Sequence, residues 1–245
     1  MTGRNCQLIT VNDYDELSTT AGQIITALVR SKPTCTLGLA TGGTPLGTYQ
    51  YLVARYRAGD ISLKEVQTFN LDEYCELPRQ HSQSYYRFMQ ENLFGHVDLR
   101  PENVHIPCTE DCDPQAQCDD YNRLLNSATV DLQLLGIGSN GHIGFCEPGT
   151  SFEQETFLTS LSEETRLDNQ RFFNSLDEVP HSAITMGIAN ILRARSILLI
   201  ASGKGKARCI ADMVNGPITE QVPASALQLH ADVTVIVDKD AAALL

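Results

Sequence analysis

The chain has 245 residues, of which 42% are hydrophobic and 20% are charged, and its formal net charge is −12. This acidic balance argues against binding to nucleic acid or to an anionic membrane surface, because either partner requires a basic footprint. The N-terminal stretch has no apolar signal core, and no apolar run approaches the roughly 18 residues that span a bilayer, so we expect a cytoplasmic protein.

Strand and helix patterns alternate along the chain. Residues 15–31 show the apolar spacing of a helix, and residues 34–41 read as a short apolar strand. The helix predicted over 45–59 opens with Pro45 and closes with Gly59, the usual asymmetry of helix start and stop signals. The later predicted elements are a strand at 66–74, a helix at 82–94, a strand at 130–138, a helix at 184–196, a strand at 196–202, a helix at 206–216 and a strand at 233–238.

Apolar strands separated by helices are typical of an α/β fold with a doubly wound, mostly parallel sheet and helices on both faces. No Gly/Ser-rich or Pro-rich linker divides the chain, so we expect residues 1–245 to form a single domain. The stretch 149–180 is polar, charged and only weakly periodic. A segment of this kind in an α/β enzyme is often a mobile cover, and we expect it to be a lid over the site.

Three of the eight cysteines, Cys108, Cys112 and Cys118, cluster in a polar stretch that resembles a surface connection. Their spacing contains no C-x-x-C pair and no nearby histidine, so it does not indicate a metal site. We expect free thiols in a reducing compartment and no bound metal.

Ligands of doubly wound sheets bind where strands end and helices begin. Thr41, Gly42, Gly43 and Thr44 occupy such a position, directly before the helix that Pro45 starts. Glycines allow a ligand to approach the backbone, the first N–H groups of the helix lack internal partners, and threonine hydroxyls add donors. The pattern indicates a phosphate site; the alternative is a tight turn with an N-cap threonine.

A second strand–turn–helix junction lies at residues 201–209, where Lys204 and Lys206 flank a glycine. Lysines are poorly placed near the positive end of a helix dipole unless an anion neutralises them. Solvated surface lysines are the alternative interpretation. Two anion sites in one sheet would favour a phosphorylated small molecule as the ligand.

Asp72 and Glu73 follow the apolar positions of the strand predicted at 66–74. Adjacent strand residues point to opposite faces, so at most one of them faces the cleft unless the strand has already ended. A partly desolvated carboxylate at a strand end suits a general base, because burial raises its pKa toward neutrality. A solvated strand end or a helix N-cap is the alternative.

The stretch 132–148, "LQLLGIGSNGHIGFCEP", contains a formal G-x-G-x-x-G at 136–141. A dinucleotide fingerprint requires a full helix after its glycines, and here Pro148 and Gly149 break any helix within two turns. We therefore expect no NAD and an irregular loop that carries His142 and Glu147. A histidine near a carboxylate is a common acid/base unit.

Six stretches taken together resemble the glucosamine-6-phosphate deaminase family: "LATGGTPLGTY", "TFNLDEY", "LLGIGSNGHIGFCEPG", "NQRFF", "SGKGKA" and "ALQLH". They occur in order between about residues 34 and 238. The resemblance implies conversion of glucosamine 6-phosphate and water to fructose 6-phosphate and ammonia, without a cofactor, through ring opening and an enolamine.

The resemblance also implies a role for individual residues. Asp72 matches the base that moves the proton between C2 and C1, and His142 matches the residue that handles protons in ring opening. Asn140 and Glu147 match the partners that orient and charge-balance this histidine. The residues that match phosphate-holding positions are Thr41, Gly42, Gly43, Thr44, Arg171 and Lys206; Lys204 has no counterpart.

The sequence departs from the pattern of this family in two places, one of which bears on packing and the other on regulation. Many family members have Asn where this chain has Cys146, so loop packing is expected to differ there. The allosteric branch has basic residues soon after the Glu-Pro pair and a C-terminal extension, whereas residues 149–161 contain no Lys or Arg. We therefore expect a non-allosteric enzyme, as a monomer or a small homo-oligomer.

Three rival interpretations remain open on the sequence. A galactosamine-6-phosphate deaminase differs only in pocket details that decide the C4 epimer. A 6-phosphogluconolactonase shares the fold but has a different glycine loop and lacks the Asn-Leu-Asp-Glu-Tyr stretch. A sugar-phosphate-sensing domain of a transcription regulator binds without turnover, but it requires a DNA-binding module and a basic face.

Overall fold

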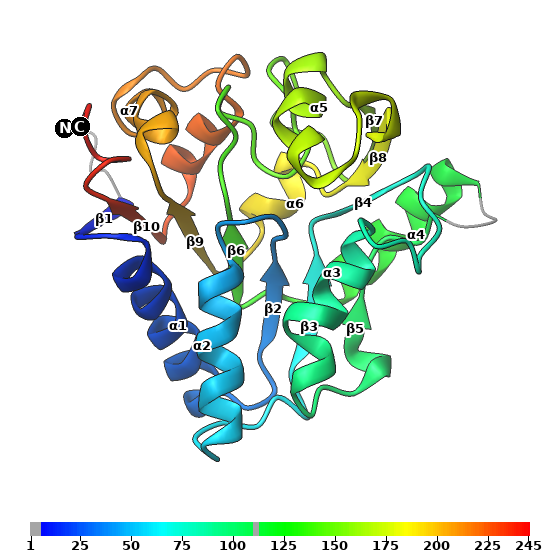
Figure 1. Cartoon of the computed structure of the whole chain (residues 1–245), viewed down its shortest axis with the longest axis vertical. Helices are drawn as coiled ribbons and strands as arrows, with labels where there is room; N and C mark the ends of the chain where they lie inside the picture. Colours follow the sequence, from blue (N-terminus) through cyan, green and yellow to red (C-terminus); the bar gives the residue numbers. More distant parts are fainter. Residues whose placement is uncertain (1–5, 110–112) are drawn as a thin grey trace.

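A parallel sheet forms the centre of the computed structural model, which describes residues 6–109 and 113–245 (Figure 1). Its strands are β1 (Cys6–Val11), β2 (Thr36–Leu39), β3 (Gln67–Asn70), β5 (Val104–His105), β6 (Leu132–Leu135), β9 (Ser196–Ala201) and β10 (Val233–Asp238). They lie side by side in the order β1-β10-β9-β6-β2-β3-β5, and all neighbouring pairs are parallel. The predicted mostly parallel sheet is confirmed.

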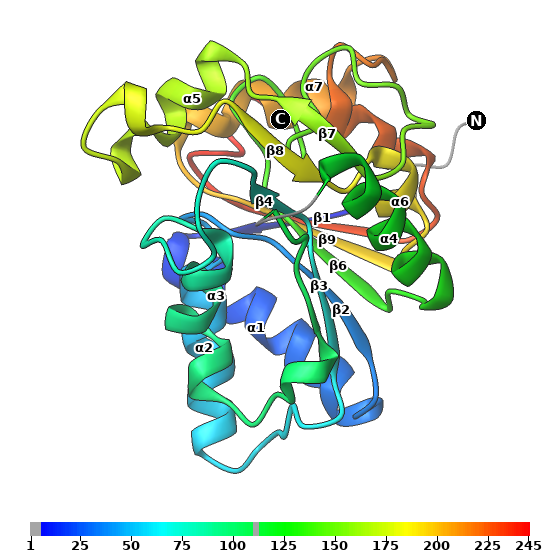
Figure 2. The same cartoon turned by 90° about the vertical axis from the view of Figure 1, so that its right-hand side faces the viewer.

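Helices cover both faces of this sheet, as predicted (Figure 2). On one side lie α1 (Tyr14–Ser31), α2 (Leu46–Arg57) and α3 (Tyr85–Asn92). On the other lie α4 (Pro114–Ser127), α6 (Ile188–Leu192) and α7 (Ala207–Asn215). A further helix, α5 (Glu163–Asn169), lies above the sheet, and short 3-10 helices occur at Phe94–His96, Pro101–Asn103, Gln170–Phe172, Leu176–Glu178, Lys204–Lys206 and Pro223–Leu229.

A second, antiparallel sheet stands above the carboxyl ends of the main strands (Figure 1). It consists of β4 (Asp72–Tyr74), β8 (Ser182–Thr185) and β7 (Phe157–Ser160), in the order β4-β8-β7. The single strand predicted at 66–74 is therefore two strands in two sheets. Leu71 joins them, because its N–H donates to the Leu39 carbonyl and its own carbonyl accepts from the N–H of Met186.

The helix predicted at 184–196 is wrong in its first half. Residues 182–185 form β8, and only Ile188–Leu192 are helical. Ala183, Ile184 and Thr185 are all fully buried, so this strand lacks the polar alternation that distinguishes a strand from a buried helix. Gly187 separates β8 from α6 as the N-cap of the helix, and only glycine fits there, because a Cβ would overlap the Gln154 carbonyl oxygen.

The main core lies between the central strands and the helices on either side. All residues of β2 and β6 are buried, as expected for parallel strands covered on both faces. Cys118 is fully buried in α4 rather than in a surface connection, while Cys108 is exposed and Cys112 lies outside the described residues. Among the described helices, none has the length and apolar character of a membrane span.

Candidate active site

A cavity of about 390 Å³ opens between the carboxyl ends of the main strands and the layer that contains α5. It gathers residues from turns that are far apart in sequence. Of the predicted site residues, Thr41, Gly42, Gly43, Thr44, Asp72, His142, Arg171 and Lys206 line it. Asn140 and Glu147 do not line the cavity; they lie behind His142 and contact it or each other.

The β2–α2 turn forms one wall of the cavity. Gly42 has φ +91°, a conformation that favours glycine, and a Cβ added at Gly42 or Gly43 would meet no atom within 4 Å. Tyr14 holds this turn in place: its hydroxyl donates toward the Gly43 and Thr44 carbonyls and accepts from the N–H of Gly47 (2.9 Å). The open backbone and the start of α2 form the kind of wall to which a phosphate binds.

Two cations line the same cavity from other elements. Lys206 lies in the turn between β9 and α7, where burial lowers the pKa of its ammonium group and Arg171 lowers it further. Arg171 lies in the 3-10 helix that follows α5, with its guanidinium 4.9 Å from the centre of the Phe172 ring. Lys204 is exposed and does not line the cavity, as the resemblance implied.

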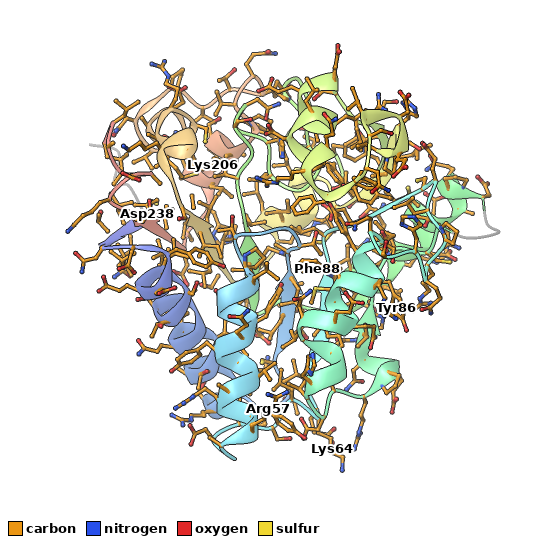
Figure 3. All side chains as sticks on the ribbon, viewed as in Figure 1. Arg57, Lys64, Tyr86, Phe88, Lys206 and Asp238 are labelled. Atoms are coloured by element: carbon orange, nitrogen blue, oxygen red, sulfur yellow. The ribbon has the colours of Figure 1, made fainter. Side chains whose placement is uncertain are left out.

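Asp238 fixes the turn that carries Lys206, a role that sequence reasoning missed. At the end of β10, its carboxylate accepts from the Ser202 hydroxyl (2.5 Å) and from the Gly203 N–H (3.0 Å). In Figure 3, Lys206 and Asp238 lie on the same side of the molecule, with Asp238 at the upper end of its strand and Lys206 above it. An acid at the end of a terminal strand gives no sequence signal for such a contact.

The adjacent acids of β4 have different environments, as strand alternation predicts. Asp72 lines the cavity, and burial, followed by the neighbouring charge of Glu73, raises the pKa of its carboxyl to about 8. Glu73 points the other way and accepts from the backbone N–H groups of Tyr74, Tyr85 and Tyr86 at 2.8–2.9 Å. Glu73 thus anchors the start of α3, and Asp72 is the carboxyl available to a ligand.

His142, Asn140 and Glu147 form a directed hydrogen-bond chain. A carboxylate only accepts, so Asn140 turns its Nδ2 toward Glu147 Oε2 (2.9 Å) and its Oδ1 toward His142 Nδ1 (2.7 Å). These contacts assign the proton to Nδ1 and leave Nε2 as the proton-accepting nitrogen. Burial lowers the pKa of His142, and the negative charge of Glu147, 3.9 Å away, opposes that effect.

The glycines of the 136–141 motif create space for this histidine. A Cβ on Gly138 would overlap the His142 ring, and Gly141 has φ +85° at the turn. The loop that carries His142 and Glu147 is irregular, as predicted. Residues 136–156, all of them described, contain no helix, whereas a dinucleotide fingerprint requires one. The motif is a histidine-presenting loop.

Hydroxyl groups from the α5 region also reach Glu147, and sequence reasoning missed them. Ser162 Oγ donates to Glu147 Oε1 (3.0 Å), and Thr165 Oγ1 donates to the same oxygen. Ser139, in the glycine loop, donates to Asp168 of α5 (2.8 Å). Pairs separated by 15 to 29 positions carry no spacing pattern that a single sequence could reveal.

The described residues do not include a group of three or more His, Cys, Asp or Glu side chains that could hold a metal ion. The polar groups that line the cavity include the Asp72 carboxyl, the oriented His142 imidazole, two cations and the backbone of the β2–α2 turn, together with two further acids, Glu91 and Asp168. This set can transfer protons and bind an anion at the same time.

Comparison with known proteins agrees with this chemistry. A family model described as glucosamine-6-phosphate isomerases/6-phosphogluconolactonase matches residues 13–236. A glucosamine-6-phosphate deaminase of Clostridium botulinum (strain Alaska E43 / Type E3) is 48% identical over 240 residues, which cover 98% of this chain and 96% of the relative. One from Halothermothrix orenii is 50% identical over 234 residues, covering 95% and 97%.

Solved structures show the same relationship. A monomeric glucosamine-6-phosphate deaminase superposes with a TM-score of 0.96 at 45% identity, over 98% of this chain and 100% of that one. The 6-phosphogluconolactonase of Trypanosoma cruzi, at 20% identity and a TM-score of 0.79, shares the fold, with coverage of 98% and 96%. The chain belongs to the family of glucosamine-6-phosphate isomerases and 6-phosphogluconolactonases.

Proposed function

We propose that this protein is a glucosamine-6-phosphate deaminase that converts glucosamine 6-phosphate and water to fructose 6-phosphate and ammonia. The observation that carries the proposal is a single cavity in which Asp72 and His142 face the same space as the β2–α2 turn and two cations. Relatives with 48–50% identity bear this name, which supports the same substrate class here.

His142 would act first, on the closed sugar ring. Its Nε2 accepts the proton of the anomeric hydroxyl and returns a proton to the ring oxygen, so the pyranose opens to an aldehyde. Asn140 and Glu147 support this step, because they hold Nδ1–H and stabilise the imidazolium that forms between the two transfers.

Asp72 would act on the open chain. The aldehyde acidifies the C2 proton, which the carboxylate removes while O1 gains a proton that the substrate's ammonium group releases, and the product is an enolamine. Asp72 then delivers its proton to C1. The C2 amine is now an imine, to which water adds before ammonia leaves. A positioned base accelerates a proton transfer by about 10²–10⁴-fold, most effectively when its pKa is near the working pH; burial places that of Asp72 at about 8.

The phosphate would anchor the sugar without taking part in the chemistry. Thr41 to Thr44 present backbone and hydroxyl donors, while Lys206 and Arg171 supply positive charge in a protein that is acidic overall. Holding the phosphate at one end places C1 and C2 between Asp72 and His142, and this restriction of motion itself lowers the barrier.

Ammonia release from glucosamine 6-phosphate, measured in parallel with galactosamine 6-phosphate, tests the proposal. We expect ammonia and fructose 6-phosphate in equal amounts from the gluco substrate, with little release from the galacto epimer. Release only from the galacto substrate would transfer the assignment to that epimer. Release from neither would leave a sugar-phosphate-binding domain or a lactonase as the function to test.

We further propose that the enzyme works as a monomer in the cytoplasm, as one folded domain, and that segment 149–180 closes over the bound sugar. The solved relative with a TM-score of 0.96 is described as monomeric, which supports the first point. Light scattering on the purified protein should give a mass near 26.9 kDa. Hydrogen exchange should slow in 149–180 when fructose 6-phosphate is added; unchanged exchange would argue against closure.

A further inference from the structure

The carboxylate of Glu147 is held by two different parts of the chain. Its Oε2 accepts from Asn140, in the glycine loop, and its Oε1 accepts from Ser162 and Thr165, at the start of α5. A carboxylate bound on one oxygen only can rotate, whereas donors on both oxygens fix its plane. Because Asn140 donates to Oε2, the orientation of its amide depends on the plane of the Glu147 carboxylate.

Thr165 is the better placed of the two α5 donors for a specific role. Its side chain is buried, with 2% of the residue exposed, and its hydroxyl reaches Glu147. Ser162 has a second role, because its oxygen also accepts from the Thr165 N–H and caps α5. A change at Ser162 would therefore alter the helix itself, while a change at Thr165 removes one contact.

We propose that Thr165, assisted by Ser162, is a positioning residue for the reaction: its hydroxyl fixes the Glu147 carboxylate and thereby the direction of the hydrogen-bond chain through Asn140 to His142. The inference rests on the proposed deaminase function. It assigns to α5 a role beyond covering the cavity, namely to keep His142 in the tautomer whose Nε2 accepts a proton.

The direction of the hydrogen-bond chain decides which nitrogen of His142 carries the proton. If the Asn140 amide turned over, its Nδ2 would face His142 Nδ1, which would then have to accept, and Nε2 would carry the proton. That tautomer cannot take a proton from the anomeric hydroxyl. The contact would also connect ligand binding to the chemistry, because the 3-10 helix that carries Arg171 directly follows α5, which contains Thr165.

The test compares Thr165→Val and Thr165→Ala with Thr165→Ser and with Ser139→Ala. The first pair removes the hydroxyl, and Thr165→Ser retains it. Ser139→Ala is the matched control: it breaks a link between the glycine loop and α5 through Asp168 and Glu164, yet it leaves Glu147 untouched. Each variant is first checked for an unchanged circular dichroism spectrum and melting temperature within a few degrees.

In steady-state kinetics with glucosamine 6-phosphate, we expect Thr165→Val and Thr165→Ala to lower kcat about tenfold, the effect of losing one hydrogen bond to a charged group. KM should change less than about twofold, since the phosphate contacts remain. Thr165→Ser should restore most of kcat. A loss of kcat in Ser139→Ala as large as in Thr165→Val would overturn the proposal, because α5 would then act only through its docking.

The tautomer of His142 provides a readout that does not depend on turnover. Nitrogen-15 spectra of histidine-labelled protein at high pH report which ring nitrogen carries the proton, and His142→Gln identifies the resonance. We expect the Nδ1–H form in the parent, Thr165→Ser and Ser139→Ala, and a mixture of tautomers in Thr165→Val. The nearby charges of Lys206, Asp168 and Glu164 are the same in parent and Thr165 variants.

An unchanged tautomer in Thr165→Val would overturn the positioning role even if kcat fell. A parent protein that releases no ammonia would instead count against the deaminase function, while the spectra would still show whether Thr165 directs the hydrogen-bond chain. The two failures are thus distinguishable.

Discussion

Two neighbouring acids, Asp72 and Glu73, illustrate how position on a strand decides chemistry. Burial raises the pKa of both carboxyls, but three backbone N–H groups donate to Glu73 and oppose this effect, whereas burial and the charge of Glu73 raise the pKa of Asp72 to about 8. A buried carboxyl without donors to its charged form keeps its proton to higher pH. The residue that is unfavourable for folding is therefore the one suited to act as a base.

Asp72→Asn should abolish exchange of the C2 proton with solvent, because the amide cannot accept it at neutral pH. Binding of fructose 6-phosphate should stay within about threefold of the parent, since the phosphate contacts are elsewhere in the cavity. Deuterium incorporation from heavy water, measured by mass spectrometry, gives the exchange rate. Undiminished incorporation in the variant would remove Asp72 as the base.

The same substitution should increase stability in a pH-dependent way. With a folded-state pKa of about 8 against an ordinary value of 3.8, the native state holds a proton that the unfolded state releases, so this group lowers stability as pH rises through that window. We therefore compare the difference in free energy of unfolding between Asp72→Asn and the parent at two pH values. This difference should be larger at pH 8.5 than at pH 5 by about 1–3 kcal/mol, in favour of the variant.

Urea unfolding at the two pH values measures this difference. Glu153→Gln is the matched control, since Glu153 is exposed and does not line the cavity. The difference in free energy of unfolding between this variant and the parent should change less with pH than it does for Asp72→Asn. An equal advantage of Asp72→Asn at pH 5 and pH 8.5 would contradict the raised pKa.

His142→Gln should slow the reaction of the cyclic sugar phosphate more than that of an analogue locked in the open-chain form. Glutamine retains hydrogen bonding but cannot transfer protons, so only the ring-opening step loses its acid/base group. We expect a decrease in kcat of at least about 10²-fold for the cyclic substrate. Equal losses on both compounds would argue against a role in ring opening.

At the scale of elements, the site consists of turns at the carboxyl ends of β2, β6 and β9, closed by a layer that contains β4 and α5. The first turn offers open backbone, the second presents His142, and the third carries Lys206. Tyr14 and Asp238, from elements near the two chain ends, hold the first and third turns. The rigid sheet thus fixes the distances between otherwise irregular segments.

Lys206→Ala should raise KM about tenfold with little change in kcat, because the phosphate is held similarly in the ground and transition states. Lys204→Ala, two positions away in the same turn, is the control. Because Lys204 is exposed, the KM of this variant should stay within twofold of the parent value. Initial rates over a range of glucosamine 6-phosphate concentrations give both constants. Equal KM increases in the two variants would indicate general electrostatic attraction rather than a phosphate contact.

At the scale of the whole molecule, residues 149–161 connect the glycine loop to the second sheet and contain no Lys or Arg. A phosphorylated effector would find no cation in this stretch. N-Acetylglucosamine 6-phosphate should therefore leave the rate at subsaturating glucosamine 6-phosphate unchanged or lower it by competition. A several-fold increase in ammonia release on adding this compound would show that the enzyme is allosteric.

Much of the fold was predictable from local pattern. The main-sheet strands β2, β6, β9 and β10 are apolar runs bounded by turn signals, and α1, α2 and α7 have clear helical spacing. β8 was not predictable, because its residues are buried on both faces and its apolar spacing continues into α6. Neither was the break at Leu71, since only pairing with β8 separates β4 from β3.

The chemical groups of the site and their order along the chain can be recognised in the amino-acid sequence alone: glycine turns after strands, a carboxyl pair, a histidine loop and a lysine turn. These follow from periodicity and from the conformations that Gly and Pro permit. Three further properties arise only in the folded protein: Asp72 rather than Glu73 faces the cavity, burial raises the pKa of Asp72, and Thr165 holds Glu147. Such properties depend on burial and on contacts between distant segments, which a local pattern does not encode.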